Sequence, residues 1–316
     1  MSVRVPILLS FYGLSNGKRN LFFGKLAYSP TGDLSFKAYN RLKTFKTIIA
    51  LYRTRAVANQ EFEMTFDHGM IRGTTDASGS FWCEADMNEL QTKLVSIRLL
   101  PSGQNVLLTE DLYPNRIHHI DTHTLVISDL DDTLIHSFIR NKFLQVHALL
   151  FTRVEKRKAV KDMAHLIKRL ALSGATALYL SNSEQNLYPM LYRFLLINEF
   201  PSGPLFLRQY IRLRDMVVKR LLRKKNVHKL TTLGKLIELF PNKKYILIGD
   251  NTQRDLTIYL EIARLHPDKV RYIIIRKVYE RDEDKQVIEQ ARERLKQHNI
   301  GLHYSSTFPE DLPWDV

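Results

Sequence analysis

From about residue 121 onward, short apolar runs alternate with helical patterns, and this alternation constrains the fold more than any other feature of the chain. The apolar runs are Thr124–Ile127, Thr176–Leu180, Leu205–Leu207, Lys244–Ile248 and Tyr272–Ile275. The helical patterns between and after them are Lys161–Leu172, which Gly174 closes, Leu233–Phe240, Leu256–Leu265 and Asp282–His298. Strands that alternate with helices imply a parallel sheet covered on both faces. In such sheets the ligand lies beyond the carboxyl ends of the strands.

One of these strand ends carries paired carboxylates. The run Thr124–Ile127 leads directly into Ser128–Leu134, which reads SDLDDTL. Two carboxylates two residues apart at a strand end can both point into one site. This pattern suits phosphoryl transfer, in which one Asp attacks phosphorus, the other moves a proton, and a divalent cation neutralises charge. An acidic turn or a helix cap explains the segment alone equally well, so the downstream motifs decide.

Three further polar elements follow along the chain. The run ending at Leu180 leads into Ser181 and Asn182, whose hydroxyl and backbone N–H groups could hold a phosphate oxygen. Lys229 begins a helical pattern and could stabilise a phosphoryl transition state, although chemistry alone does not single it out among its basic neighbours. The run ending at Ile248 leads into Gly249, Asp250 and then Asp255, whose oxygens suit Mg²⁺. Each element alone is an ordinary turn or cap, but the four in this order point to a phosphatase site.

Residues 1–117 have a different pattern. Short runs rich in β-branched, aromatic or other apolar residues occur at Ile7–Tyr12, Asn20–Phe23, Thr47–Tyr52 and Glu61–Phe66. Turn residues separate them at 15–17, 30–33, 67–69 and 76–79. Many short strands with little helical periodicity predict a smaller all-β sandwich. We expect an accessory domain over residues 1–117 and a catalytic domain over residues 118–316.

The order of the motifs resembles the haloacid dehalogenase superfamily of aspartate-nucleophile phosphatases. Within it, residues 118–280 are similar to the catalytic domain of the actin-patch-associated phosphatidate phosphatases and their bacterial relatives. The motifs that carry the resemblance are Ser128–Thr133 (SDLDDT), Tyr179–Ser183 (YLSNS), Leu187–Pro189, Phe200–Pro204 (FPSGP), His228-Lys229, Ile246–Asp250 (ILIGD), Tyr259, Glu261–Arg264, His266-Pro267 and Ile275-Arg276. The resemblance implies a haloacid dehalogenase-like Rossmannoid parallel sheet with a minimal cap. The N-terminal half more loosely resembles the β-sandwich of the bacterial members.

The resemblance also implies residue roles. Asp129 would be the nucleophile and Asp131 the proton donor and acceptor. Ser181, Asn182 and Lys229 would hold the transferring phosphoryl group. Mg²⁺ would be held by the Asp129 carboxylate, the backbone carbonyl of Asp131, Asp250 and, directly or through water, Asp255. Thr133 would position the loop. The set of site residues is therefore Asp129, Asp131, Ser181, Asn182, Lys229, Asp250 and Asp255.

The chain departs from the family pattern at two places next to the site. Family members usually carry Pro-Trp after Ser-Asn-Ser, where this chain has Glu184-Gln185. They usually carry Ser-Gly after Gly-Asp, where this chain has Asn251-Thr252. Both changes leave the principal groups in place and put substrate identity and the surroundings of the metal in question.

The net charge of +14 is concentrated in residues 208–229, where nine basic side chains accompany Asp215 alone. Such a segment attracts phosphorylated substrates, an anionic membrane face or nucleic acid. Its pattern is that of a basic amphipathic helix, which can lie on an anionic membrane. Only Tyr210 offers a stacking ring nearby, which disfavours nucleic acid. A phosphatidate-type lipid phosphate fits this charge.

The short stretch around Phe143–Phe151 allows only a modest flap over the site.

The rest of the composition limits the cellular compartment and the other possible functions. A single cysteine, Cys83, excludes an intramolecular disulfide and fits a reducing cytoplasm. We find no signal peptide and no apolar stretch long enough to span a bilayer, so we expect a cytoplasmic protein, peripheral on the membrane at most. Two other functions stay open, namely a phosphatase acting on a soluble phosphoester or phosphoprotein and a catalytically idle adaptor.

Overall fold

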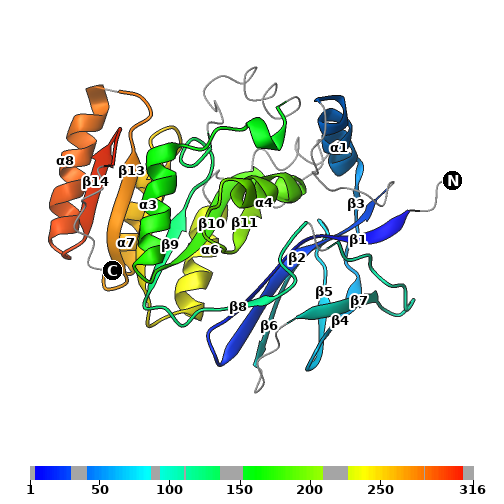
Figure 1. Ribbon diagram of the computed structural model, residues 1–316. Coiled ribbons are helices and arrows are strands. Elements are labelled where there is room, and N and C mark those ends of the chain that lie inside the picture. Colours follow the sequence, from blue (N-terminus) through cyan, green and yellow to red (C-terminus); the bar gives the residue numbers. More distant parts are fainter. Residues whose placement is uncertain are drawn as a thin grey trace.

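The computed structural model describes residues 4–29, 41–86, 93–109, 112–135, 152–208, 227–280 and 282–308. Its C-terminal part is built on a parallel sheet with the strand order β11-β10-β9-β12-β13-β14 (Figure 1). The strands are β9 (Thr124–Ser128), β10 (Thr176–Glu184), β11 (Leu205–Arg208), β12 (Lys244–Asp250), β13 (Val270–Arg276) and β14 (Gly301–Ser305). The chain is therefore α/β, as the alternating pattern predicts, although β14 was not foreseen.

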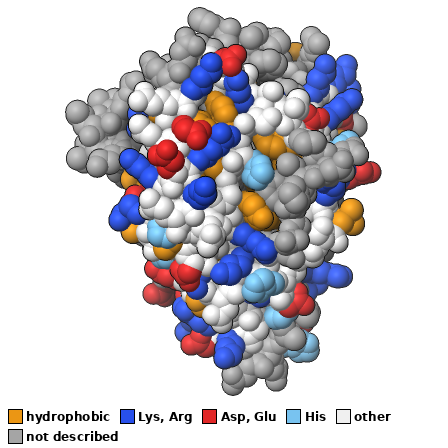
Figure 2. All heavy atoms as spheres, turned by 90° about the vertical axis from the view of Figure 1, so that its left-hand side faces the viewer, with side chains coloured by type: hydrophobic (Ala, Val, Ile, Leu, Met, Phe, Trp, Pro, Cys, Tyr) orange, Lys and Arg blue, Asp and Glu red, His pale blue; other side chains and the backbone are white. Residues whose placement is uncertain are grey.

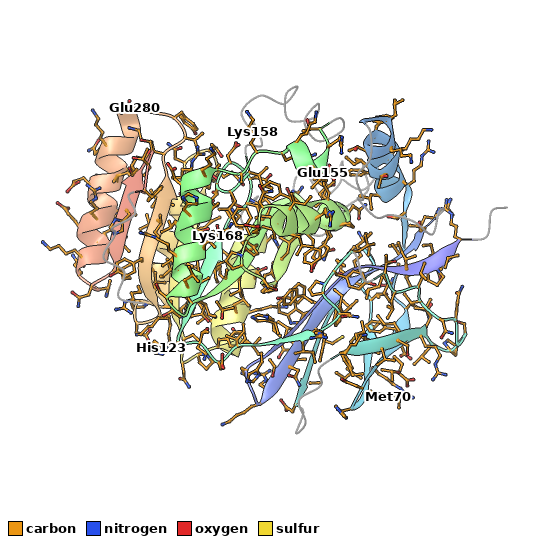
Figure 3. All side chains as sticks on the ribbon, in the orientation of Figure 1. Met70, His123, Glu155, Lys158, Lys168 and Glu280 are labelled. Atoms are coloured by element: carbon orange, nitrogen blue, oxygen red, sulfur yellow. The ribbon has the colours of Figure 1, made fainter. Side chains whose placement is uncertain are left out.

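The register of the central strands brings their carboxyl ends together. Ser128 at the end of β9 lies opposite Tyr179 of β10 on one side and Ile248 of β12 on the other. In Figure 3, His123, which precedes β9, and Glu280, which follows β13, mark opposite edges of the sheet. The carboxyl edge is the one near Glu280. The segments that leave β9, β10 and β12 therefore meet at this edge.

Helices cover both faces of the sheet. They are α3 (Lys161–Leu172), α4 (Tyr188–Ile197), α6 (Val227–Leu239), α7 (Asp255–Leu265) and α8 (Asp282–Lys296), with short 3₁₀ turns at Val154–Lys156 and Gln185–Leu187. Alternate residues of β9 point to opposite faces. Val126 joins the core that includes α3 and α4, whereas Leu125 and Ile127 join the core that includes α6 and α7. The helix expected over Lys161–Leu172 is confirmed residue for residue, and Gly174 follows it with a φ of +94°.

The N-terminal part contains two further sheets. The first has the order β3-β2-β1-β8, with β6 also paired to β2, and the second has the order β5-β4-β7. Their strands are β1 (Val5–Ser15), β2 (Arg19–Ser29), β3 (Arg55–Ala56), β4 (Glu61–Phe66), β5 (Gly69–Thr74), β6 (Ser80–Asp86), β7 (Leu94–Leu99) and β8 (Ile117–His119). All these pairs are antiparallel except β1 with β8. The sheets contact one another through Phe22 and Phe66, with ring centroids 4.8 Å apart, and through Phe62 and Phe81 at 4.9 Å.

One predicted strand is wrong. Residues Thr47–Tyr52, expected as β, belong to helix α1 (Arg41–Arg53). Ile48 and Leu51 are both fully buried, and a spacing of three residues places them on one helical face. Two other predictions fall on parts of the chain outside the described ranges, namely most of the basic segment (209–226) and the flap around Phe143–Phe151.

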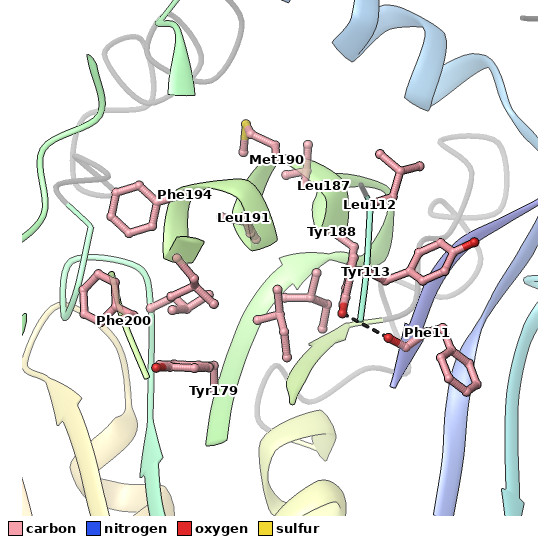
Figure 4. Packing of buried hydrophobic residues seen from close by; sticks show 14 of the residues in the cluster. Phe11, Leu112, Tyr113, Tyr179, Leu187, Tyr188, Met190, Leu191, Phe194 and Phe200 are labelled. Carbon is pink, nitrogen blue, oxygen red and sulfur yellow. Dashed lines mark hydrogen bonds between the residues drawn. The ribbon is translucent and has the colours of Figure 1, made fainter. Parts of the chain in front are cut away.

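The N-terminal sheets and the α/β part meet around α4 and the turn before it. Tyr188 Oη donates to the carbonyl of Phe11 in β1 over 3.2 Å (Figure 4). Asn186 Nδ2 donates to the carbonyl of Leu51 in α1 over 3.1 Å, and Lys25 Nζ donates to Asn186 Oδ1 over 2.8 Å. The segment after β10 is thus held by the β half of the molecule.

The opposite side of the molecule, formed by α8 and β14, carries interspersed basic and acidic side chains (Figure 2). Helix α8 buries Ile288, Ala291 and Leu295 and pairs Arg292 with Glu289 over 3.4 Å on its outer side. Among the helices in the described ranges, none has the length and apolar character to cross a membrane.

Candidate active site

Asp129 is the first residue after β9, and its carboxylate is completely buried. Its backbone N–H donates to the carbonyl of Ile248 over 2.8 Å, which fixes the residue between β9 and β12. Lys229 Nζ lies 2.9 Å from Asp129 Oδ1 and 2.5 Å from Asp255 Oδ1, and all three side chains are fully buried. Lys229 comes from the first turn of α6 and Asp255 begins α7. The fold thus brings together three residues that the sequence analysis selected from separate motifs.

A cluster of three carboxylates, Asp129, Asp250 and Asp255, surrounds this lysine. Each offers an oxygen that lies within 4.8 Å of the others, and all three residues are buried. Thr133 Oγ1 donates to Asp250 Oδ2 over 2.8 Å, which ties the first motif loop to the end of β12. Three carboxylates against one ammonium group leave an excess of negative charge in a dry site. Hard carboxylate oxygens in such a cluster suit Mg²⁺.

The protonation of the cluster supports a cation there. Burial raises the pKa of Asp129 well above its usual range, Lys229 opposes this, and Asp255 and Asp250 add to it. Burial, with help from Asp255, raises the pKa of Asp250 to about 6. Burial would lower the pKa of Lys229, but Asp129 and Asp255 outweigh it, so its pKa is raised and the side chain stays an ammonium. A divalent cation would supply the missing positive charge, so the residues present fit a metal.

Asp131 has a different environment from Asp129. Its Oδ2 accepts hydrogen bonds from Ser181 Oγ over 2.9 Å and from Ser183 Oγ over 2.6 Å. Both hydroxyls come from the end of β10. The Asp131 residue is only half-buried, and its side chain is not one of the three clustered carboxylates. A carboxylate that is fixed in direction and open to solvent can exchange protons with a substrate or with water.

Two local features of the backbone keep the site compact. A Cβ on Gly249 would lie 2.5 Å from Asp255 Oδ2, so only glycine leaves room for that carboxylate. Asp132 adopts a φ of +57°, in the left-handed region. Its N–H donates to the carbonyl of Ile135 over 2.8 Å, and its carbonyl accepts from Arg276 Nη1 over 2.6 Å. These bonds hold the loop that carries Asp129 and Asp131 in its turn.

Gln253 was not selected from the sequence, although it contacts Asp129. Its Nε2 donates to Asp129 Oδ2 over 3.2 Å, and its Oε1 accepts from Asn182 Nδ2 over 2.9 Å. Ser183 was likewise given no role, yet it donates to Asp131. Position gives the only sequence signal for either residue: Gln253 lies between Asp250 and Asp255, and Ser183 is two residues after Ser181.

The two departures from the family pattern both make contacts beside the site. Thr252 donates its N–H to Asp250 Oδ1 over 2.6 Å and also donates its hydroxyl to the same oxygen. Asn251 Nδ2 donates to the carbonyl of Tyr279 over 2.8 Å. Gln185 Oε1 accepts from Ser80 Oγ of β6 over 2.6 Å. The Asn251-Thr252 departure therefore supports a carboxylate of the cluster, and the Glu184-Gln185 departure connects the β10 segment to the N-terminal half.

Comparison with known proteins gives a consistent set of matches. Residues 124–277 match the family model described as Phosphatidate phosphatase APP1, catalytic domain. The chain is 25% identical over 212 residues to Phosphatidate phosphatase APP1 of Saccharomyces cerevisiae, which covers 66% of this chain and 35% of that protein. It is 26% identical over 154 residues to an uncharacterized protein of Schizosaccharomyces pombe, which covers 48% of this chain and 25% of that protein. The matched part is thus well under half the length of either relative.

Among solved structures, that of a Pnkp1/Rnl/Hen1 complex aligns with a TM-score of 0.33 at 17% identity, covering 65% of this chain and 54% of that chain. A likeness of this size carries no argument about the fold.

Proposed function

Because residues 124–277 of this chain belong to the phosphatidate phosphatase APP1 catalytic-domain family, we propose that the chain is a Mg²⁺-dependent hydrolase that removes phosphate from a lipid phosphomonoester through an aspartyl-phosphate intermediate. The observation that carries this proposal is the buried Asp129, with Lys229 2.9 Å away and two further carboxylates beside it. In this proposal, residues 118–316 form a haloacid dehalogenase-like catalytic domain with a minimal cap, and residues 1–117 form an accessory β-sandwich.

The reaction would proceed in two steps. An Asp129 oxygen attacks phosphorus while the bond from phosphorus to the lipid alkoxide breaks, and Asp131 donates a proton to that alkoxide. Water then attacks phosphorus while Asp131 takes its proton, the bond from phosphorus to the Asp129 oxygen breaks, and inorganic phosphate leaves with the Asp129 carboxylate restored. Lys229, Ser181 and Asn182 would hold the phosphoryl oxygens. When the Ser181 hydroxyl turns from Asp131 to a phosphoryl oxygen, the hydrogen bond from Ser183 still keeps the Asp131 carboxylate aimed in one direction.

Asp129, Asp250 and Asp255, with the backbone carbonyl of Asp131, would hold Mg²⁺. When bound, the cation would neutralise negative charge on the transferring phosphoryl group. The raised pKa values of Asp129 and Asp250 support this proposal, because a cation favours the ionised carboxylates that burial disfavours.

The decisive experiment is release of inorganic phosphate from phosphatidate in detergent micelles, with and without Mg²⁺, for the wild-type chain and Asp129→Asn. We expect Mg²⁺-dependent release by the wild type and a loss of about 10³-fold or more in the variant, because the amide is a poor nucleophile. Circular dichroism of the variant should match the wild type, since Lys229 keeps Asp255 as its partner. Turnover by Asp129→Asn near the wild-type rate would sink the nucleophile assignment.

Two alternatives are separated by the same assay. Release from soluble phosphoesters or phosphopeptides but not from the lipid would keep the mechanism and change the substrate. No release from any substrate would favour an adaptor with an idle phosphatase fold. Peripheral binding of the basic segment 208–229 to an anionic membrane, with the protein in the cytoplasm, stays a prediction, because residues 209–226 of that segment lie outside the described ranges.

A further inference from the structure

A cavity of about 630 Å³ lies between the N-terminal sheets and the α/β half. Its first wall is formed by residues of β1, β2 and β6, among them Phe23, Phe81 and Trp82, and its second wall by β11 and α6. A volume of this size is in the range of about 300–1,000 Å³ that small-molecule sites occupy. The proposed reaction assigns no role to this cavity.

The walls are largely aromatic and firmly packed. Phe23 stacks on Phe206 of β11 with ring centroids 4.4 Å apart, and on Trp82 of β6 at 5.8 Å. Stacked aromatic rings from both halves of the molecule therefore form one side of the cavity. Trp82 in this stack is only half-buried. Tyr188 and Leu207 add further apolar surface to the lining. A rigid wall of this kind suits an apolar guest.

The rest of the lining is mainly cationic or neutral. Arg208 at the end of β11 and His228 and Lys235 of α6 all line the cavity. Lys235 Nζ lies 4.2 Å from the centre of the Trp82 ring. The acidic member of the lining, Asp76, accepts the N–H groups of Ser78 over 2.7 Å and Ser80 over 3.1 Å within its own turn. Apolar walls beside basic side chains favour an anionic amphiphile over a neutral or cationic ligand.

The cavity and the phosphate site share two chain segments. His228 lines the cavity, while the next residue, Lys229, contacts Asp129. Gln185 also lines the cavity, and Ser183, two residues earlier, donates to Asp131. Both segments leave or enter elements at the carboxyl edge of the sheet. The cavity therefore adjoins the proposed phosphate site at two points along the chain, His228-Lys229 and Ser183–Gln185.

We propose that this cavity between the halves receives the acyl chains of the lipid phosphomonoester whose phosphate is held at Asp129. The proposal rests on the lipid phosphatase function above and deepens it, because it gives the N-terminal sheets a direct part in substrate binding. Binding energy from an apolar part remote from phosphorus can support reaction at the phosphate. The proposal identifies Trp82 as a reporter and Thr231, an exposed lining residue of α6, as a position from which the cavity can be filled.

The test uses the chain with Trp314→Phe, so that Trp82 is the sole tryptophan, and with Asp129→Asn, so that the lipid is not consumed. The probe is phosphatidate with brominated acyl chains in detergent micelles, compared with the same lipid without bromine. Bromine quenches tryptophan emission only at close contact. We expect the brominated lipid to quench Trp82, and Thr231→Tyr to weaken the apparent affinity by about tenfold.

The matched control is Thr257→Tyr, the same change at an exposed position of α7 that does not line the cavity. We expect quenching in this variant to equal that of the unsubstituted chain. Equal quenching by the brominated and unbrominated lipids, or equal affinities for Thr231→Tyr and Thr257→Tyr, would overturn the cavity proposal.

Activity separates this proposal from the function on which it rests. In the catalytically intact chain, Thr231→Tyr should lower the ratio of kcat/KM on phosphatidate to kcat/KM on a soluble phosphoester by about tenfold, and Thr257→Tyr should leave it unchanged. Hydrolysis of phosphatidate without quenching of Trp82 would refute the cavity and keep the lipid phosphatase. Quenching of Trp82 without hydrolysis would refute the phosphatase function and keep a lipid-binding cavity.

Discussion

Gln253 joins two residues that the sequence motifs treat separately, because one end of its amide contacts Asp129 and the other contacts Asn182. The donated N–H fixes the direction of the Asp129 carboxylate. Such a contact lowers the entropy that must be lost when the nucleophile approaches phosphorus. Gln253 is thus a positioning residue for the proposed nucleophile.

Gln253→Leu keeps most of the side-chain volume and removes the donor. We expect kcat on phosphatidate to fall by about 10- to 100-fold with a smaller change in KM, as for other residues that orient a reacting group. Gln253→Glu, which adds a carboxylate beside Asp129, should reduce kcat at least as much. Steady-state kinetics of both variants would refute the assignment if Gln253→Leu keeps the wild-type kcat.

In the proposed Mg²⁺ site, Asp250 should make metal binding depend on pH. Its folded pKa of about 6 lies above the ordinary 3.8, so the folded state binds more protons between these values. The stability of the metal-free protein should therefore fall as the pH rises from about 4 to 6. Mg²⁺ should raise the Tm clearly at pH 7.5 and much less at pH 5, because protons compete for the carboxylate.

The matched variant is Asp250→Asn. It removes one negative charge from the cluster, so its metal-free Tm should not show the same fall between pH 4 and 6. Added Mg²⁺ should raise its Tm little at either pH. Calorimetry that finds equal Mg²⁺ shifts in the wild type and in Asp250→Asn would exclude Asp250 as a ligand.

The positions of most site residues could be predicted because each one begins or ends a strongly patterned element. Asp129 and Asp250 follow apolar strand runs, and Lys229 begins a helical pattern. Gln253 lies in a turn, where a glutamine has no distinguishing periodicity, and its value comes entirely from contacts with Asp129 and Asn182. Such contacts depend on tertiary structure, which local pattern does not contain.

Among the helices and strands, the junction from β12 to α7 is tightly packed at Gly249. Gly249 ends the apolar part of β12, and the carboxylate of Asp255 occupies the space that a side chain would need. Gly249→Ala should displace Asp255, lower the free energy of unfolding by about 1–3 kcal/mol, and weaken the apparent affinity for Mg²⁺. Urea unfolding and Mg²⁺ titration of phosphate release measure the two effects.

The control is Gly234→Ala in α6, where an added Cβ meets no atom within 4 Å. This change should be neutral or stabilise the protein by about 0.5–1 kcal/mol, since alanine favours helix. Equal effects at Gly249 and Gly234 would show that crowding by Asp255 is unimportant.

The helix at Arg41–Arg53 shows where local pattern fails. The β-branched and aromatic residues of Thr47–Tyr52 favour a strand by propensity, but propensity is a weak guide. Ile48 and Leu51 are buried against the rest of the core as one face of a helix. By contrast, Glu61–Phe66 alternates strictly and forms β4 with the expected bounds. Periodicity was therefore sufficient to predict β4. For Thr47–Tyr52, packing of Ile48 and Leu51 against the core determined that the segment is helical.

The two halves of the molecule are joined through buried polar groups as well as apolar ones. Lys25 of β2 is buried and bonds to Asn186, which in turn bonds to the carbonyl of Leu51. The first of these contacts joins residues 161 positions apart in the chain. No local pattern contains such a contact, so the arrangement of the halves could not be predicted from the sequence.

Lys25 gives this junction a dependence on pH. Burial lowers the pKa of Lys25 to about 8, with Asp76 and Glu184 opposing the shift. Between pH 8 and the ordinary value of 10.5, the unfolded chain binds more protons at this site, so this contribution to stability rises with pH. Lys25→Met removes this pH-dependent contribution to stability. We expect the unfolding free energy of the wild type, minus that of the variant, to increase by about 3 kcal/mol from pH 7.5 to 10.5.

Lys18→Met, at an exposed lysine in the turn between β1 and β2, serves as the control and should leave this difference flat. Urea unfolding at several pH values measures both. If the difference in unfolding free energy between the wild type and Lys25→Met does not change with pH, then burial of the Lys25 ammonium does not destabilise the folded protein.

The contact between Arg276 and the carbonyl of Asp132 has a consequence for how the protein is made. A ribosome delivers the first motif loop long before it delivers Lys229, Asp250 and finally Arg276. Since domains fold from the N-terminus as they emerge, the N-terminal sheets can form while Asp129 still lacks its counter-charge and its loop lacks its anchor. A nascent chain released before β13 would thus carry a folded β half and a first motif loop without its Arg276 anchor, so the proposed site is completed only after β13 has been made.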